Sequence, residues 1–159
     1  MTTPLEQVES KNIDLAKYIG VGKPTKDRKW HQVAAFPAWF QKDVQGHQLQ
    51  DVTAVYTQRK GYVEVKNSGK LIDGKRKVQL GKAFPSDKPN VLKVKFFPLQ
   101  PGADYIIEFV DKKYKYAIVG SSSKAYLWIL ARGRVTPMIR DQLTQIAKRK
   151  GYDVGRLES

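Results

Sequence analysis

Residues 125–132 have the sequence AYLWILAR, and this stretch constrains how the rest of the chain is arranged. Successive side chains of a strand point to opposite faces, so the stretch predicts a strand that is apolar on both sides. One face carries Tyr126, Trp128 and Leu130, and the other carries Leu127, Ile129 and Ala131. Other parts of the chain must therefore cover both faces.

Arg132 ends this apolar row, where a charged side chain needs either a partner or water. Its guanidinium could lie over an aromatic ring and close a cavity, because cations are attracted to the faces of aromatic rings. Alternatively, it marks the point where the strand reaches solvent. This stretch leaves both alternatives open.

The chain has 159 residues, which suits a single domain over 1–159 that needs no covalent cross-links. It contains no Cys, which excludes disulfides, thiolate metal sites and a thiol nucleophile. The first residues, MTTPLEQVESK, lack the pattern of a signal peptide, and no apolar run reaches the roughly 18 residues of a membrane span. We expect a cytoplasmic protein as written, or a secreted or periplasmic one if a leader was removed.

The chain carries 29 Lys and Arg residues against 15 Asp and Glu residues, a formal net charge of +14. This charge admits nucleic acid, an anionic membrane face and anionic small ligands as partners. The basic residues are spread along the whole sequence, which is typical of a generally cationic surface. The aromatic side chains are expected on strand faces opposite the lysines, whereas single-strand binders stack bases on rings within a basic groove.

Short apolar runs with period-two alternation, separated by polar turns, predict eight strands. They are expected at residues 30–36, 51–57, 62–67, 75–84, 91–97, 103–110, 116–119 and 125–132. Residues 1–29 are expected to form an N-terminal turn and loop, and 38–50 a long loop. Such a pattern is typical of an antiparallel barrel or sandwich, so residues 30–132 are expected to be all-β.

One late segment, residues 136–150, breaks the strand pattern and predicts an α-helix. Thr136 is a favourable N-cap, Pro137 suits the first helical position, and basic residues precede Gly151 at the other end. Its apolar stripe consists of Ile139, Leu143 and Ile146. We expect this helix to cover apolar positions outside the sheet, with 151–159 as a C-terminal segment.

An eight-stranded barrel has an interior that is either filled by side chains or holds one small ligand. The residues expected inside include small ones, such as Ala54, Gly81 and Ala83, which would leave a void where they face one another. Polar groups such as Asn67 and Gln79 among apolar neighbours are typical of small-molecule sites. A filled barrel and a ligand cavity both remain open at this point.

Seven blocks carry a family resemblance by their order and spacing. They are WHQVAAFP (30–37), DVTAVY (51–56), GYVEVKN (61–67), GKAF (81–84), LKVKFF (92–97), DKKYKYAIVG (111–120) and YLWILAR (126–132), followed by the helix and GYDV (151–154). Together they resemble the lipocalins, in particular the bacterial lipocalin and apolipoprotein D-like branch. The resemblance implies an all-β, eight-stranded antiparallel up-and-down β-barrel, a lipocalin-like calyx, with one C-terminal α-helix packed outside and a hydrophobic ligand within.

The resemblance also implies roles at the closed end of the barrel. Trp30 matches the tryptophan that closes the barrel floor, and Arg132 matches the arginine stacked across it. Asp111, with Tyr114 or Tyr116, matches a loop motif between the sixth and seventh strands.

Two departures from the family accompany these matches. The family usually has Gly two residues before the tryptophan, where this chain has Arg28. A glycine in a similar apolar context, YIG, occurs at Gly20, as though residues 21–28 had been inserted. The lipid-anchor Cys of bacterial relatives has no counterpart in this chain, so membrane anchoring is not carried over.

Inward alternation and depth in the barrel predict the side chains that line the calyx, whose wide end is placed at the loop after Phe36. The predicted lining residues are Ala34, Phe36, Val52, Ala54, Val65, Asn67, Phe96, Tyr105, Val119, Tyr126 and Trp128. The floor is expected to be packed core formed by Tyr56, Val63, Phe109 and Leu130. An anionic ligand head is expected at the rim, near Lys42, Lys66 or Lys70. Three roles are open for Trp39 and Phe40: a lid over the mouth, a loop tip that touches a membrane, or residues that simply anchor the loop.

No residue grouping indicates catalysis, a metal or a cofactor. His31 and His47 are expected to be solvated surface residues, and Glu64 and Glu108 to face outward. The sequence SSSK at 121–124 is expected to be a polar turn rather than a Ser-Lys nucleophile.

These observations favour a non-enzymatic carrier that holds a fatty acid, a lysophospholipid or a similar amphiphile in the barrel. The alternative is a basic surface module with a filled barrel, which would bind nucleic acid or an anionic membrane.

Overall fold

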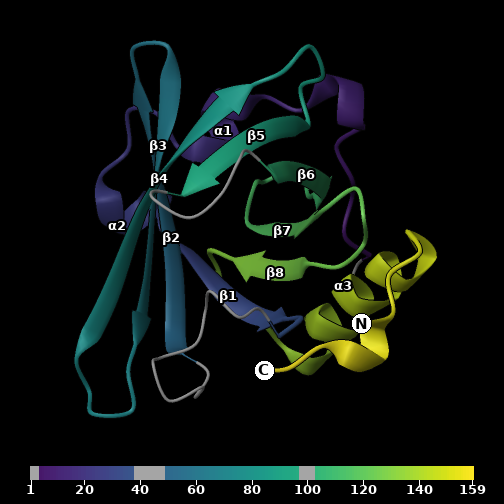
Figure 1. The fold of residues 1–159 in the computed structure, drawn as a ribbon. Helices are drawn as coiled ribbons and strands as arrows, with labels where there is room; N and C mark the ends of the chain where they lie inside the picture. Colours follow the sequence, from purple (N-terminus) through teal and green to yellow (C-terminus); the bar gives the residue numbers. More distant parts are fainter. Residues whose placement is uncertain (1–3, 38–48, 97–102) are drawn as a thin grey trace.

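The computed structural model describes residues 4–37, 49–96 and 103–159, except the side chains of Phe96 and Ala103. Its eight strands close into a barrel in chain order, each antiparallel to its neighbours (Figure 1). The strands are β1 (Trp30–Ala35), β2 (Gln50–Arg59), β3 (Tyr62–Lys70), β4 (Arg76–Pro85), β5 (Val91–Phe96), β6 (Ala103–Val110), β7 (Tyr116–Gly120) and β8 (Leu127–Ala131). The predicted up-and-down β-barrel is confirmed.

Short helices precede and follow the barrel. They are η1 (Ser10–Asn12), α1 (Leu15–Ile19), α2 (Thr25–Arg28), α3 (Pro137–Arg149) and η3 (Val154–Arg156). The predicted start of α3 is confirmed, because the Thr136 side chain accepts a hydrogen bond from the Ile139 backbone N–H and Pro137 lies in the first turn. Within the described ranges, no helix combines the length and apolar character that crossing a membrane requires.

The helix α3 lies against the outer side of the barrel, next to β7 and β8 (Figure 1). Leu143 and Ala147 on its inner side are fully buried in an outer cluster of apolar side chains. The strand residues of this outer cluster are Phe109, Tyr116, Ile118, Leu127, Ile129 and Ala131. The two apolar faces of β8 are thus both covered, one by α3 and the other by the barrel interior.

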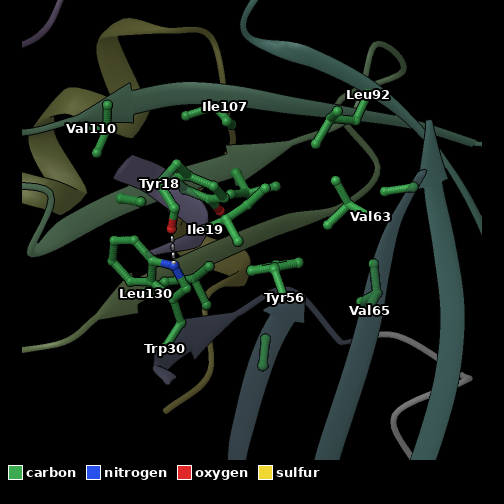
Figure 2. Packing of buried hydrophobic residues seen from close by; sticks show 14 of the residues in the cluster. Tyr18, Ile19, Trp30, Tyr56, Val63, Val65, Leu92, Ile107, Val110 and Leu130 are labelled. Carbon is green, nitrogen blue, oxygen red and sulfur yellow. Dashed lines mark hydrogen bonds between the residues drawn. The ribbon is translucent and has the colours of Figure 1, made fainter. Parts of the chain in front are cut away.

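The interior contains a second apolar cluster, which surrounds Trp30 at one end of the barrel (Figure 2). Trp30 is 0% exposed, and Tyr18 and Ile19 of α1 are buried beside it. The other members that line this end include Tyr56, Val63, Val65, Leu92, Ile107, Ala117 and Leu130. The segment before the barrel therefore closes this end.

A β-bulge reverses the faces of β1 after its first residues. The register with β8 shifts between Gln32 and Ala34. Beyond the shift, Ala34 pairs with Ile129 of the outer cluster, whereas Ala35 pairs with Trp128, which packs against the interior cluster. One extra residue in a strand exchanges its inward and outward positions. Ala34, expected in the calyx wall, therefore faces outward, and Ala35 takes the inner position.

A second bulge has the same effect in β6. Its register with β7 shifts between Ile107 and Phe109, so Phe109 pairs with Ile118 and joins the outer cluster. Ile107 stays in the interior cluster. Phe109, expected in the floor, packs beneath α3 instead, because the inserted residue moves it to the other face.

The free part of the β1 edge is occupied by the C-terminal segment. The strand β2 pairs with β1 at Trp30 and His31. Further along, the backbones of Ala35 and Glu158 exchange two hydrogen bonds, with N···O distances of 2.9 and 2.8 Å. Residues near both ends of the described chain are thus tied to the barrel, since Gln7 forms a similar bridge with Asp111.

Candidate functional site

Trp30 and Arg132 meet at the closed end of the barrel. The Arg132 guanidinium carbon lies 3.9 Å from the centroid of the indole ring, so the cation covers the ring face. The same guanidinium donates hydrogen bonds to the backbone oxygens of Lys17, Tyr18, Arg28 and Tyr114. Burial lowers the pKa of Arg132 from its ordinary value, and the nearby tyrosines oppose that change. One side chain therefore connects four segments of the chain at this end.

The residue that sequence analysis did not place here is Tyr18. Its backbone oxygen accepts a hydrogen bond from Trp30 Nε1, at 3.1 Å (Figure 2). It accepts a second from Arg132 Nη2, at 2.5 Å. The pattern of residues 12–20 indicates a short helix with buried apolar groups, but not where that helix lies. Its position depends on distant contacts, including the hydrogen bond from the Asp14 N–H to the Tyr114 hydroxyl.

Arg28 stands where the family resemblance implies a glycine, and its side chain packs against Gly20. A Cβ atom at Gly20 would lie 2.8 Å from the Arg28 Cγ, and Gly20 has a φ of 84°. The Arg28 guanidinium reaches the backbone oxygen of Tyr56 at 2.6 Å and the Thr57 hydroxyl at 3.2 Å. Residues 25–28 form α2 in the segment between Gly20 and Trp30, and Trp30 is buried.

Three tyrosines from different elements meet inside the barrel above this floor. The Tyr105 hydroxyl of β6 is hydrogen-bonded to the Tyr18 hydroxyl of α1 and, at 2.6 Å, to the Tyr56 hydroxyl of β2. The rings lie 5.7 to 6.5 Å apart between centroids. Burial raises the pKa of each of these three phenols above its ordinary value. We call this group the tyrosine triad.

The raised pKa values predict a loss of stability at alkaline pH. In the unfolded chain each phenol ionises near its ordinary pKa of 10.0, whereas in the fold it keeps its proton to higher pH. The unfolded state then binds fewer protons above about pH 10, so the free energy of unfolding falls as pH rises through that range. Thermal unfolding measured from about pH 8 to about pH 12 should show a steeper decline than in a Tyr105→Phe variant. Equal declines would contradict this assignment.

The exposure of inward-facing side chains changes along the barrel axis. At the closed end the interior residues are buried, whereas a set nearer the other end is partly exposed. That set consists of Val52, Asn67, Gln79, Tyr105, Tyr126 and Trp128. An inward-facing side chain stays accessible only where space lies beside it, so the barrel is sealed at one end and open toward the other.

A pocket lies at this more open end, between β2, β3 and β4. It is lined by Leu49, Val52, Asn67, Ser68, Gly69, Lys77 and Gln79. The expected rim lysines Lys66 and Lys70 are exposed and occupy outward positions of β3, because alternation places Val65, Asn67 and Gly69 inside. The lysine at the mouth is therefore Lys77, while Lys42 lies outside the described residues.

Most predicted lining residues come together on the inner surface. Ala54, Val65 and Val119 belong to the interior cluster, Tyr105 and Trp128 pack against it, and Val52 and Asn67 line the mouth pocket. Tyr126 precedes β8 and stacks on Trp128 with 5.8 Å between ring centroids.

Phe36 is wrong as a calyx residue. It packs outside the barrel, where its ring lies 6.3 Å from the Tyr152 ring and the Arg156 guanidinium covers it at 4.6 Å. The bulge in β1 is the cause, as for Ala34. The side chain of Phe96, and Trp39 and Phe40, lie outside what the structure describes.

The residues considered for catalysis are either exposed or held in contacts that stabilise the fold. His31 is exposed, Glu64 contacts Arg59 on the outer face, and Glu108 accepts a hydrogen bond from the Tyr152 hydroxyl at 2.6 Å. Residues 121–124 form a polar turn in which the Ser121 hydroxyl accepts from the Tyr126 N–H. His47 lies outside the described residues. Within the described ranges no three His, Asp or Glu side chains gather as metal ligands do.

The loop motif between β6 and β7 is held by a single carboxylate. The Asp111 side chain accepts hydrogen bonds from the backbone N–H groups of Lys113, Lys115 and Tyr116. Tyr114 has a positive φ of 55° in this turn. Asp111 is thus a structural residue that fixes the turn on which Tyr114 reaches Arg132 and α1.

Comparison with known proteins identifies the family. A model of the lipocalin-like domain matches residues 13–159. The chain is 31% identical to temperature-induced lipocalin-1 of Arabidopsis thaliana, over 99% of this chain and 83% of that protein. It is 34% identical to outer membrane lipoprotein Blc of Escherichia coli (strain K12), over 91% and 77% respectively. For apolipoprotein D of Mus musculus the identity is 31%, over 92% and 75%.

Solved structures share the fold at lower identity. Lobster apocrustacyanin A1 has a TM-score of 0.64 and 17% identity, over 99% of this chain and 91% of that one. Insecticyanin from the tobacco hornworm Manduca sexta has a TM-score of 0.62 and 17% identity, over 100% and 85%. The sealed barrel, the external helix, the Trp30–Arg132 contact and the sequence matches agree, and the chain belongs to the lipocalin family.

Proposed function

We propose that the protein binds a single-chain amphiphilic lipid, such as a fatty acid or a lysophospholipid, inside the barrel and carries it without catalysis. Lipocalins bind small hydrophobic ligands and are in general non-enzymatic binding proteins. The observation that carries the finer proposal is the change in exposure along the barrel, with a sealed floor and partly exposed inner walls. The inner walls combine apolar residues such as Val65 and Val119 with a few polar groups, which suits a chain with one polar end.

The direct test is titration with a fluorescent fatty acid while Trp128 fluorescence is recorded. Saturable binding with quenching is expected, because Trp128 packs against the interior cluster and remains partly exposed. Native mass spectrometry of protein from its own source should show a co-purifying lipid. Absence of both saturable binding and a co-purifying lipid would overturn the proposal.

A cavity-filling variant should weaken binding of the fluorescent fatty acid. Val52→Trp adds a large ring to the mouth pocket, and we expect the dissociation constant to rise about tenfold or more, equivalent to about 1.4 kcal/mol. The control is Val55→Trp, which lies on the outer face of the same strand, opposite Lys66. Probe fluorescence and the melting temperature are measured for both variants. Equal weakening by the two would contradict a ligand at the mouth.

A second candidate function is contact with an anionic lipid surface. The outer face of β4 exposes Val78 (50%), Leu80 (55%) and Phe84 (37%), which are apolar groups unusual on a sheet face in water. Their cross-strand neighbours are basic, since Leu80 pairs with Lys66 and Phe84 with Lys93. Apolar side chains framed by lysines suit a surface that is apolar beneath and anionic above.

Sedimentation with vesicles tests this second candidate. More protein should co-sediment with vesicles that contain phosphatidylglycerol than with vesicles of phosphatidylcholine alone. Leu80→Glu should reduce the fraction that co-sediments. Val21→Glu is the matched control, because Val21 is also exposed but belongs to the segment between α1 and α2 and not to β4. On this face the Lys82 ammonium lies over the Tyr62 ring, and the Phe84 ring lies near Tyr62, contrary to the expected separation of rings and lysines. A salt-dependent shift of a labelled oligonucleotide without vesicle retention would favour nucleic acid instead.

A further inference from the structure

We propose that the tyrosine triad is a polar subsite inside the barrel that hydrogen-bonds an oxygen at the leading end of the ligand, so that an amphiphile enters with its oxygen-bearing end first. This inference rests on the proposed lipid-binding function and adds the ligand's orientation and the chemical class of its inner end.

The hydroxyls of the tyrosine triad are hydrogen-bond donors. Three phenols supply three O–H protons, and each is in the neutral form that donates. Among the described residues, the hydroxyls of Tyr18, Tyr56 and Tyr105 form two hydrogen bonds with one another. Where Tyr18 and Tyr56 both donate to the central oxygen, the O–H of Tyr105 itself is left for a further acceptor.

The three members of the triad differ in their exposure. Tyr105 is the central member of the triad, and it packs against the interior cluster while remaining partly exposed. Tyr18 and Tyr56, by contrast, are buried, with only 1% and 4% of their surface exposed. Tyr105 is therefore the member of the triad that a ligand from the open end would reach, while Tyr18 belongs to the closed floor.

The triad lies in the field of a positive charge. The Arg132 guanidinium donates to the backbone oxygen of Tyr18, and its positive charge acts on all three phenols. In the described part of the chain no salt bridge joins Arg132 to a carboxylate. A cation near a donor group favours a carboxylate or another electron-rich oxygen over a hydrocarbon end. A fatty acid carboxyl fits this chemistry better than a methyl terminus does.

The opposite orientation has its own structural basis, which makes the inference testable. The lining of the mouth pocket includes Lys77, Asn67 and Gln79, so a ligand with its head at the mouth would place its hydrocarbon end against the triad. Burying the spare phenol donor against hydrocarbon leaves a hydrogen-bonding group unsatisfied, which is unfavourable by about 1 to 3 kcal/mol. The triad therefore favours the head-inward orientation.

The experiment uses stearic acid that carries a nitroxide either near the carboxyl (position 5) or near the methyl end (position 16). Trp39→Phe/Trp128→Phe protein keeps Trp30 as its single tryptophan, at the floor below the triad. We expect the nitroxide near the carboxyl to quench Trp30 more strongly. Stronger quenching by the nitroxide near the methyl end would overturn the inference while leaving lipid binding intact.

A variant pair gives a second measurement. Tyr105→Phe keeps the ring and removes the central hydroxyl, so the dissociation constant for palmitic acid should rise about tenfold. Tyr62→Phe, on the outer face, is the matched control and should leave it unchanged. If Tyr105→Phe does not fold, Tyr56→Phe removes an outer hydroxyl of the triad and is used in its place. Unchanged affinity in the triad variant would overturn the inference, and failure of wild-type protein to bind either fatty acid would overturn the proposed function as well.

Discussion

Arg132→Ala should lower the melting temperature by about 6 to 12 °C and leave lipid affinity nearly unchanged. The guanidinium covers Trp30 and hydrogen-bonds four backbone oxygens on three separate segments outside its own strand. A buried cation–π contact and a set of charged hydrogen bonds together contribute about 3 kcal/mol, and for a chain of this size each kcal/mol corresponds to roughly 2 to 4 °C. Differential scanning calorimetry measures the first quantity, and fluorescent fatty acid titration the second.

Two further variants separate the contributions at this site. Arg132→Lys keeps the charge but not the planar fork of donors, so it should recover only part of the lost stability. Arg134→Ala removes an exposed arginine two residues away and should change the melting temperature by little. If Arg132→Ala abolished fatty acid binding without lowering the melting temperature, Arg132 would belong to the ligand site and not to the floor.

Gly120→Ala should destabilise the fold by about 3 kcal/mol, because no room exists for a side chain at the end of β7. A Cβ atom there would lie 1.9 Å from the Tyr152 hydroxyl oxygen and 2.5 Å from its Cζ. Tyr152 is 3% exposed in the outer cluster, and its hydroxyl donates to Glu108. The added methyl must therefore displace the ring, break that hydrogen bond and disturb the packing beneath α3. Chemical denaturation measures the change in free energy of unfolding.

A double-mutant cycle identifies the cause of this loss. In a Tyr152→Ala background, Gly120→Ala should be nearly neutral, because the group that it strikes is gone. Gly133→Ala is the matched control, since its nearest contact to the added Cβ would be 3.4 Å, at the Tyr116 hydroxyl. Additive effects of the substitutions at Gly120 and Tyr152 would show that the steric conflict is not the cause.

The alternation of apolar and polar side chains made the strands of the barrel predictable from the sequence. The β-bulges, which reverse this alternation, were not predictable. In β5 the residues Leu92 and Val94 point inward and Lys93 and Lys95 outward, as their alternation predicts. In β1 and β6 a single extra residue reverses the faces, and nothing in the local composition marks Val33 or Glu108 as the position of a bulge. The assignments of Ala34, Phe36 and Phe109 failed for this reason.

The tyrosine triad could not be predicted for a different reason. Tyr56 and Tyr105 were expected inside the barrel from their strands, but their third partner, Tyr18, comes from a five-residue helix outside the barrel. A short amphipathic helix shows which residues are buried, but its own pattern does not reveal what they are buried against. Position in space, set here by the contacts of α1 with Trp30, Tyr114 and Arg132, is a property of the whole fold.

The bridge between Ala35 and Glu158 also bears on how this barrel avoids unwanted association. A strand edge with free N–H and C=O groups is a template on which a second polypeptide can add a strand. At Ala35 both groups are already bonded to Glu158, so that position of the β1 edge offers no free pair. The C-terminal segment thus blocks this position of the β1 edge against pairing with a strand of another molecule. This role is separate from ligand binding and from closing the floor.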